Sequence, residues 1–297
     1  MKTAIIIQGP TAAGKTAIAI ALAERLQTAV VSADSRQCYL GMDIGTAKPT
    51  PAELNRVPHY FIDEYPVTTL LTAADYETIA LQHLENIFTS NDYAVVCGGT
   101  GLYIKALCEG MDAMPPVTPA IDQEITVQYN LLGIDWLRKQ IQQQDPTFYA
   151  TGETDNPARM LRALVFIRST KESITTYRTG IKKERDFRIL KIGIELPREV
   201  LYARINARVD TMMLQGLEAE ARSLYEYRNS KNLQTVGYSE LFAYFDGLCT
   251  LAEAVDKIKQ HTRNYAKRQL TWFKKDEETV WLRADDEDVV GKIMEVV

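Results

Sequence analysis

Residues 9–16 read Gly-Pro-Thr-Ala-Ala-Gly-Lys-Thr and match the phosphate-loop pattern G-x-x-x-x-G-K-[ST]. In this pattern the glycines let the backbone fold around an anion, and amide groups at the start of the next helix point toward it. Lys15 adds a cation, and Thr16 offers a hydroxyl group suited to Mg²⁺. The sequence therefore predicts a site for a diphosphate or polyphosphate group. The residues predicted to form it are Gly9, Pro10, Thr11, Ala12, Ala13, Gly14, Lys15 and Thr16.

The surroundings of this loop argue against a fortuitous glycine-rich turn. A β-branched apolar stretch at 4–8 precedes the loop, and a helical pattern at 15–26 follows it, which is the context that the pattern requires. Residues 28–32 and 93–97 are further short apolar stretches typical of strands, and residues 73–89 have helical spacing. The alternation of strands and helices predicts an α/β fold with a doubly wound parallel sheet.

The alternation stops at the proline-rich stretch 114–119, and strand character returns only at 187–195. The chain between them is polar and helical in pattern. We therefore predict a phosphate-loop α/β catalytic core made of residues 1–115 and 187–297, interrupted by a helical insertion domain of residues 116–186. The remaining predicted elements are helical stretches at 197–227 and 237–275 and a last strand at 279–283.

The composition of the chain is that of a soluble globular protein, with 46% hydrophobic and 25% charged residues. The sequence has no apolar run of membrane-spanning length and leaves no room for a signal peptide before the first strand, so we expect a cytoplasmic protein without membrane contact. The four cysteines form no CxxC pair and are expected to be reduced thiols. Because the net charge is −5, any nucleic-acid surface must be local.

The strand at 93–97 lacks the acidic Mg²⁺ ligand that nucleotide-hydrolysing enzymes with a phosphate loop place after a neighbouring strand. Cys97 and two glycines stand there instead. The nearest acidic residue at the expected ligand edge is Asp34, which follows the strand at 28–32. This pattern favours a loop that holds a diphosphate without splitting a nucleotide.

Two loops beyond the strand ends each allow two interpretations. Asp34 can act as a general base or metal ligand, or else Asp34 or Ser35 can cap the N-terminus of a helix by accepting backbone N–H groups. The loop at 98–101 can be only a tight turn, or it can place the Thr100 hydroxyl against a phosphate or a reacting atom. The residues alone leave both questions open.

Positive charge gathers near the end of the chain. Residues 257–275 contain no carboxylate and carry Lys257, Lys259, Arg263, Lys267, Arg268, Lys274 and Lys275, interleaved with Tyr265, Trp272 and Phe273. Cations mixed with aromatic rings suit nucleic acid, although a solvated helix with inward-packed rings is the more ordinary interpretation of this stretch alone. Arg159 and Arg162 give a second, weaker basic signal.

Taken together, these segments resemble the tRNA dimethylallyltransferase family, also called tRNA isopentenyltransferases, in its bacterial type. The matching stretches follow the family order across nearly the whole chain, and residues 32–49 and 262–269 are the most specific. They are residues 9–16, 32–37, 41–49, 98–105, 208–209, 234–238 and 262–273.

The resemblance implies an activity. Such enzymes transfer the dimethylallyl group of dimethylallyl diphosphate to N6 of the adenosine on the 3′ side of the anticodon in tRNA, releasing diphosphate. By resemblance, the phosphate loop and Mg²⁺ bound at Thr16 would hold the diphosphate, with Arg208 nearby. Asp34 would accept the proton of the adenine amine, and Thr100 would orient the reacting groups or bind the diphosphate.

The resemblance also implies a monomer that flips the target base out of the stack and clamps the anticodon stem-loop with its helical insertion. The residues implied to face tRNA are Asp34, Ser35, Arg36, Gln37, Ala158, Arg159, Arg162, Gln234, Gly237, Tyr238, Arg263, Lys267 and Arg268. Two positions depart from the family pattern: Ala13 replaces a common serine, and Tyr60 replaces the second histidine of Pro-His-His, whose role is therefore not carried over.

Two other functions compete with prenyl transfer. A small-molecule kinase of the nucleotide or shikimate type would use the same phosphate loop with ATP, and an RNA-binding protein would carry the loop as a vestige. The missing carboxylate after Cys97 argues against the first, and the intact Lys15 and Thr16 argue against the second. Whether ATP binds in addition to the prenyl diphosphate, which five-carbon donor is preferred and which tRNAs are modified stay open.

Overall fold

The computed structural model describes residues 1–297, which divide into two compact units. The larger unit comprises Met1–Gly110 and Lys183–Val297, and the smaller one comprises Met111–Lys182. The boundaries expected from the sequence lay after residues 115 and 186. No helix combines the length and the apolar character that crossing a membrane requires.

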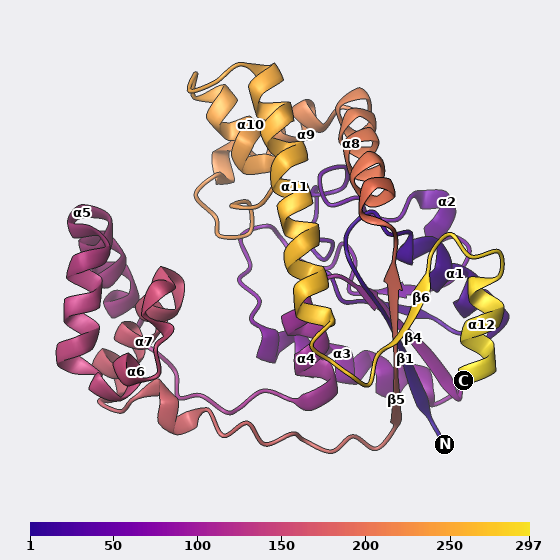
Figure 1. Ribbon diagram of the computed structural model, residues 1–297, viewed down its shortest axis with the longest axis horizontal. Coiled ribbons are helices and arrows are strands. Elements are labelled where there is room, and N and C mark those ends of the chain that lie inside the picture. Colours follow the sequence, from indigo (N-terminus) through magenta and orange to yellow (C-terminus); the bar gives the residue numbers. More distant parts are fainter. The chain divides into compact units, whose positions relative to one another are not determined.

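The larger unit is built on a six-stranded sheet in which every neighbouring pair of strands is parallel. The strand order is β3-β2-β4-β1-β5-β6, with β1 near the centre (Figure 1). This sheet confirms the α/β fold predicted from the sequence. The strands are β1 (Thr3–Gln8), β2 (Val30–Ser32), β3 (His59–Tyr60), β4 (Tyr93–Gly98), β5 (Arg188–Glu195) and β6 (Val280–Arg283).

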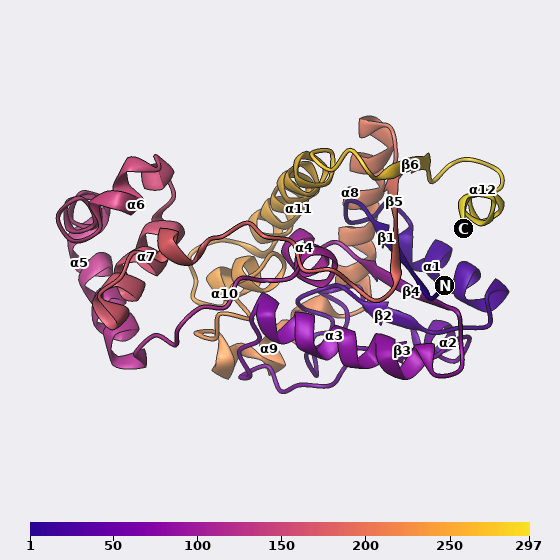
Figure 2. The ribbon, with the colours of Figure 1, turned by 90° about the horizontal axis from the view of Figure 1, so that it is seen from below.

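All six residues of β1 are buried, as expected for a central parallel strand covered on both faces. Ile5 and Ile7 point to one face of the sheet and pack in a cluster with residues of α1 (Lys15–Arg25) and α12 (Val289–Val296). Since side chains alternate along a strand, Ile6 points to the opposite face. There α3 (Ala73–Phe88) and α4 (Gly101–Glu109) pack against each other beside the sheet (Figure 2).

Both long helical stretches predicted after β5 are interrupted. Gly216, with a φ of +101°, separates α8 (Arg198–Leu214) from α9 (Leu217–Ser223). Gly247, with a φ of +75°, lies in the break between α10 (Tyr238–Phe245) and α11 (Leu251–Phe273). A glycine adopts such angles without a Cβ clash, so each break has a local cause. Three short elements were not predicted from the sequence: β3, the helix α2 (Pro51–Leu54) and α12.

The smaller unit is helical and contains no strand. Its core includes Ile141 of α5, Phe148 of α6 and Leu164 of α7. The buried Asp145 ties the elements together, because its carboxylate accepts hydrogen bonds from Phe148 N and from Ser173 Oγ. The elements are α5 (Pro119–Gln144), α6 (Pro146–Ala150), η1 (Glu153–Asp155), α7 (Pro157–Thr170) and η2 (Ile174–Tyr177).

Candidate active site

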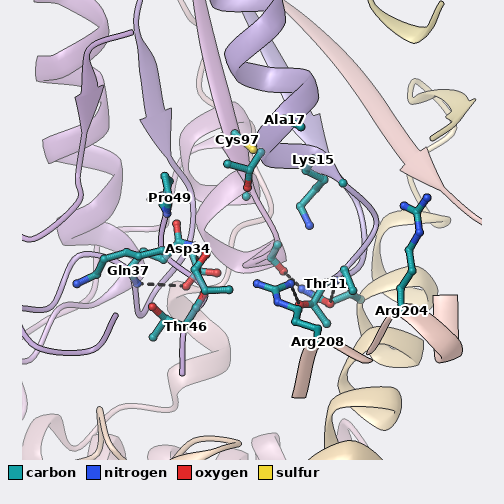
Figure 3. Close-up of a pocket in the computed structure, with 18 of the residues that line it drawn as sticks. Thr11, Lys15, Ala17, Asp34, Gln37, Thr46, Pro49, Cys97, Arg204 and Arg208 are labelled. Atoms are coloured by element: carbon teal, nitrogen blue, oxygen red, sulfur yellow. Dashed lines mark hydrogen bonds between the residues drawn. The ribbon is translucent and has the colours of Figure 1, made fainter. Parts of the chain in front are cut away.

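The phosphate loop joins β1 to α1 at the carboxyl edge of the sheet and lines a cavity of about 420 Å³ (Figure 3). Gly9 has a φ of +146°, and a Cβ atom there would overlap the carbonyl oxygen of Ile194. Gly14, with a φ of +91°, is the residue immediately before α1. The two glycines thus meet backbone requirements that other residues would satisfy only with strain.

Lys15 is the cation of this loop. Its ammonium group donates a hydrogen bond of 2.7 Å to the carbonyl oxygen of Pro10, within the same loop. Burial lowers the pKa of Lys15 to about 8, because the charged form loses solvation. A bound anion would restore a charged partner, so the site is suited to stabilising one. Thr16 lines the same cavity.

Two arginines on α8 face the phosphate loop. Arg208 donates a hydrogen bond of 3.3 Å from Nη1 to Thr11 Oγ1, and burial lowers the pKa of its guanidinium. Arg204 lies one helical turn earlier and lines the same cavity. Arg208 was predicted, whereas Arg204 was missed, although a spacing of four residues on a helix places two side chains on one face.

In the loop after β2, Asp34 caps a turn, and no helix follows it directly. Its Oδ1 atom accepts hydrogen bonds from the backbone N–H groups of Arg36, at 2.8 Å, and Gln37, at 3.4 Å. Asp34 also lines the cavity of the phosphate loop, and no hydrogen bond within the chain engages its Oδ2 atom. The two interpretations left open by the sequence are therefore compatible, because one oxygen holds the turn and the other is available.

The loop after β4 is tight and also places Thr100 beside the Asp34 loop. A Cβ atom on Gly98 would overlap the carbonyl group of Ala33, so only glycine fits there. The backbone N–H of Ser35 donates to Thr100 Oγ1 at 3.0 Å, and the Thr100 hydroxyl donates to Ser35 Oγ at 3.3 Å. Burial raises the pKa of the neighbouring Cys97 to about 11, so this thiol is protonated at neutral pH.

A second cavity, of about 580 Å³, adjoins the first. Its walls combine apolar side chains such as Ile205 and Met212 of α8 with polar groups of α11 and of the loop before α10. The residues that line both cavities are Thr11, Asp34, Thr46, Arg208 and Tyr265. Asp34 thus lies where the cavity lined by residues within 11–17, by Arg204 and by Arg208 meets a larger cavity with an apolar wall.

Comparison with known proteins shows which family the chain belongs to. The family model described as IPP transferase matches residues 37–276. The chain belongs to the IPP transferase family. A tRNA dimethylallyltransferase of Cytophaga hutchinsonii is 46% identical over 280 residues, which cover 94% of this chain and 92% of that protein. The family resemblance found in the sequence is therefore confirmed.

Two solved structures of the IPP transferase family have the same fold. A full-length tRNA isopentenylpyrophosphate transferase from Bacillus halodurans matches with a TM-score of 0.73 and 36% identity, covering 100% of this chain and 94% of that one. A tRNA delta(2)-isopentenylpyrophosphate transferase from Staphylococcus epidermidis matches with a TM-score of 0.72 and 33% identity, covering 100% and 98%.

In this member of the IPP transferase family, the basic stretch near the end of the chain forms α11, which runs past α8, α10 and α4 (Figure 1). Lys267 and Arg268 are exposed on it, whereas Arg263 donates a hydrogen bond of 2.6 Å to Asn206 Oδ1. The three aromatic residues of this stretch have different surroundings. Phe273 packs inside, Tyr265 lines both cavities, and Trp272 is 41% exposed. Helix α11 therefore serves the site on one face and presents cations on another.

Other residues predicted to face tRNA have different surroundings. Gln234 and Gly237 line the second cavity, as do Ser35 and Arg36, while Gln37 lines the first. The side chain of Tyr238 cannot contact tRNA at the protein surface, because it is fully buried. Its hydroxyl donates to Glu220 Oε1 at 2.7 Å, and its ring packs against Gly45.

Glu220 was not predicted from the sequence to be part of the site. Its carboxylate accepts hydrogen bonds from the N–H groups of Asp43, Ile44 and Gly45, at 2.7–3.0 Å, and so holds the loop that carries Thr46. Gln37 supports the same loop by donating to the carbonyl oxygens of Thr46 and Ala47. A lone glutamate on α9 gives no sequence signal for such a role.

Ala158, Arg159 and Arg162 belong to α7 of the smaller unit and are exposed there. Arg159 forms an ion pair with Glu153, whose pKa is lowered by hydrogen bonds from Arg178 and Arg159. No group of three or more His, Cys, Asp or Glu side chains able to hold a metal ion is found.

Proposed function

We propose that this chain transfers the dimethylallyl group of dimethylallyl diphosphate to N6 of the adenosine on the 3′ side of the anticodon in tRNA. The observation that carries the proposal is the position of Asp34, which lines both the phosphate-loop cavity and the adjoining cavity. A donor held by its diphosphate and an adenine entering from the other space would meet beside this carboxylate. The names of the relatives point to the same reaction.

The first cavity would hold the diphosphate of the donor. Backbone amides of Gly14, Lys15 and Thr16, the Lys15 ammonium and the two guanidinium groups of Arg204 and Arg208 line it with hydrogen-bond donors. Thr16 fits a Mg²⁺ ion, since this metal takes a few hard protein oxygens and completes its shell with phosphate oxygens and water. A bound Mg²⁺ would neutralise charge on the leaving diphosphate.

In the transfer step, the bond between the prenyl carbon and the diphosphate oxygen breaks, and a bond from adenine N6 to that carbon forms. The departing diphosphate takes the electron pair of the broken bond, where Lys15 and Arg208 stabilise its charge. The N6 proton passes to the free oxygen of Asp34, while the other oxygen keeps the turn in place. Thr100 holds the Asp34–Ser35 loop in position through its two hydrogen bonds with Ser35.

The second cavity would receive the adenosine, which must leave the base stack to reach Asp34. Ser35, Arg36, Gln234 and Gly237 line this space and would contact the base or its neighbours. The exposed cations of α11, together with Arg159 and Arg162 of the smaller unit, would bind phosphates of the anticodon stem-loop. We propose that the enzyme acts as a monomer in the cytoplasm.

Labelled dimethylallyl diphosphate tests this proposal directly. The chain is incubated with unmodified tRNA and Mg²⁺, and incorporation of label into RNA is measured beside release of diphosphate. The proposal predicts equal amounts of both products and no incorporation when the target adenosine is replaced by guanosine. Hydrolysis of ATP or phosphorylation of a small molecule without transfer to tRNA would support a kinase instead.

A further inference from the structure

The buried amide of Gln269 joins two loops of the site. Its Oε1 atom accepts a hydrogen bond of 2.8 Å from the backbone N–H of Thr11, in the phosphate loop. Its Nε2 atom donates a hydrogen bond of 2.8 Å to the carbonyl oxygen of Gly99, in the loop that leads to Thr100. Gln269 is 6% exposed and lines the first cavity; its bond to Gly99 is buried, and its bond to Thr11 is partly buried.

The chemistry of this contact suits an amide. One end must accept a hydrogen bond from a backbone N–H group and the other must donate one to a backbone carbonyl, and the amide of glutamine does both without a change of protonation state. The contact also depends on the glycine at position 99, because a Cβ atom there would overlap Nε2 of Gln269. The side chain therefore fixes the distance between the two loops as well as satisfying their buried polar groups.

The two loops carry opposite halves of the reaction. The phosphate loop holds the donor, and Thr100 holds the Asp34 loop that would receive the proton from the acceptor. Helix α11 also contacts the start of α4 without Gln269, because the Trp272 ring packs where a Cβ atom on Gly101 would stand. Loss of the Gln269 bonds would thus change the spacing of the loops without releasing α11.

We propose that Gln269 is a positioning residue, which sets the phosphate loop at the correct distance from the loop that carries Thr100 and, through the hydrogen bonds between Thr100 and Ser35, from Asp34. The proposal rests on the proposed transfer reaction and assigns to Gln269 an effect on the transfer step rather than on the binding of either substrate. A displacement of about 1 Å between reacting groups is enough to slow a reaction by roughly 100-fold.

The variant Gln269→Met tests this role, because methionine has a similar length and makes neither hydrogen bond. We expect the single-turnover rate of prenyl transfer to fall by roughly 10- to 100-fold, while the Kd values for dimethylallyl diphosphate and tRNA change less than about threefold. Gln260→Met is the matched control, because Gln260 is exposed on the same helix and lines neither cavity. The control should keep the rate of the wild type.

The variant Gln269→Glu adds a measurement that a purely structural role would not move. An ionised glutamate cannot donate to Gly99, but a protonated one can, and burial favours the protonated form. The transfer rate of this variant relative to wild type should therefore rise several-fold between about pH 8 and about pH 6. This ratio keeps the proposal testable even when Gln269→Met is unstable.

The outcomes separate the two proposals. Absence of transfer by the wild type would overturn the proposed function itself. With an active wild type, a Gln269→Met rate within about twofold of normal would overturn the positioning role. So would a rate loss accounted for by weaker binding of dimethylallyl diphosphate, or a Gln269→Glu ratio that stays constant with pH.

Discussion

Replacing Asp34 by asparagine separates its two roles. The amide oxygen of asparagine keeps the acceptor for Arg36 N and Gln37 N, so the turn is preserved, but the amide cannot take a proton from adenine N6. Replacement by alanine removes both the acceptor and the base. The pair of variants therefore divides the effect of Asp34 on the reaction from its effect on stability.

The two roles of Asp34 predict losses of rate and of stability that can be estimated separately. General base catalysis contributes roughly 10²- to 10⁴-fold, or about 3–5 kcal/mol in the barrier, and both variants should lose this amount. Asp34→Ala also loses the 2.8 Å bond from Arg36 N and the weaker 3.4 Å bond from Gln37 N. Its free energy of unfolding should fall by about 1 kcal/mol, which lowers Tm by roughly 2 °C.

Single-turnover transfer from dimethylallyl diphosphate to tRNA measures the rate, and thermal unfolding measures the stability. Asp34→Asn should have the Tm of the wild type and a transfer rate at least 100-fold lower, as the lower end of the range requires. Retention of the transfer rate within about threefold by Asp34→Asn would refute Asp34 as the base. Equal losses of Tm in the two variants would refute its role in the turn.

Three further predictions concern charge and packing. Burial lowers the pKa of Lys15 to about 8, so affinity for dimethylallyl diphosphate should fall above that pH in the wild type but not in Lys15→Arg; identical profiles would contradict this. Gly98→Ala should lower the free energy of unfolding by about 1–3 kcal/mol through overlap with Ala33, and an unchanged Tm would show that the loop relaxes freely. Exchanging Lys267 and Arg268 for glutamine should make the salt dependence of tRNA binding shallower by about 1.5 in the log–log slope, and an unchanged slope would exclude phosphate contacts there.

The sequence carried enough local signal to predict the sheet and the phosphate loop. Strands such as Thr3–Gln8 are short, β-branched and fully buried, and they alternate with helices whose spacing is regular. The two-residue strand His59–Tyr60 was missed because so short an element has no periodicity of its own. The helices broken at Gly216 and Gly247 were joined because a single glycine within a helical pattern does not reveal its φ angle.

The candidate site was predictable where its residues lie in loops with a chemical signature. Asp34, Thr100 and Lys15 follow strand ends, and parallel strands bring such loops to one edge. Gln269 and Glu220 were not assigned these roles, because their contacts lie 258 and 177 residues away in the sequence. Such long-range hydrogen bonds depend on how helices pack on the sheet, which local patterns do not encode.

Mass spectrometry of tRNA nucleosides tests the central claim most directly. Unmodified tRNA with an adenosine on the 3′ side of the anticodon is incubated with the enzyme, dimethylallyl diphosphate and Mg²⁺, and is then digested to nucleosides. We expect one adenosine per tRNA to carry a dimethylallyl group on N6, located at that position by sequencing of the oligonucleotide fragments. Unchanged adenosine, or a prenyl group on another nucleotide, would contradict it.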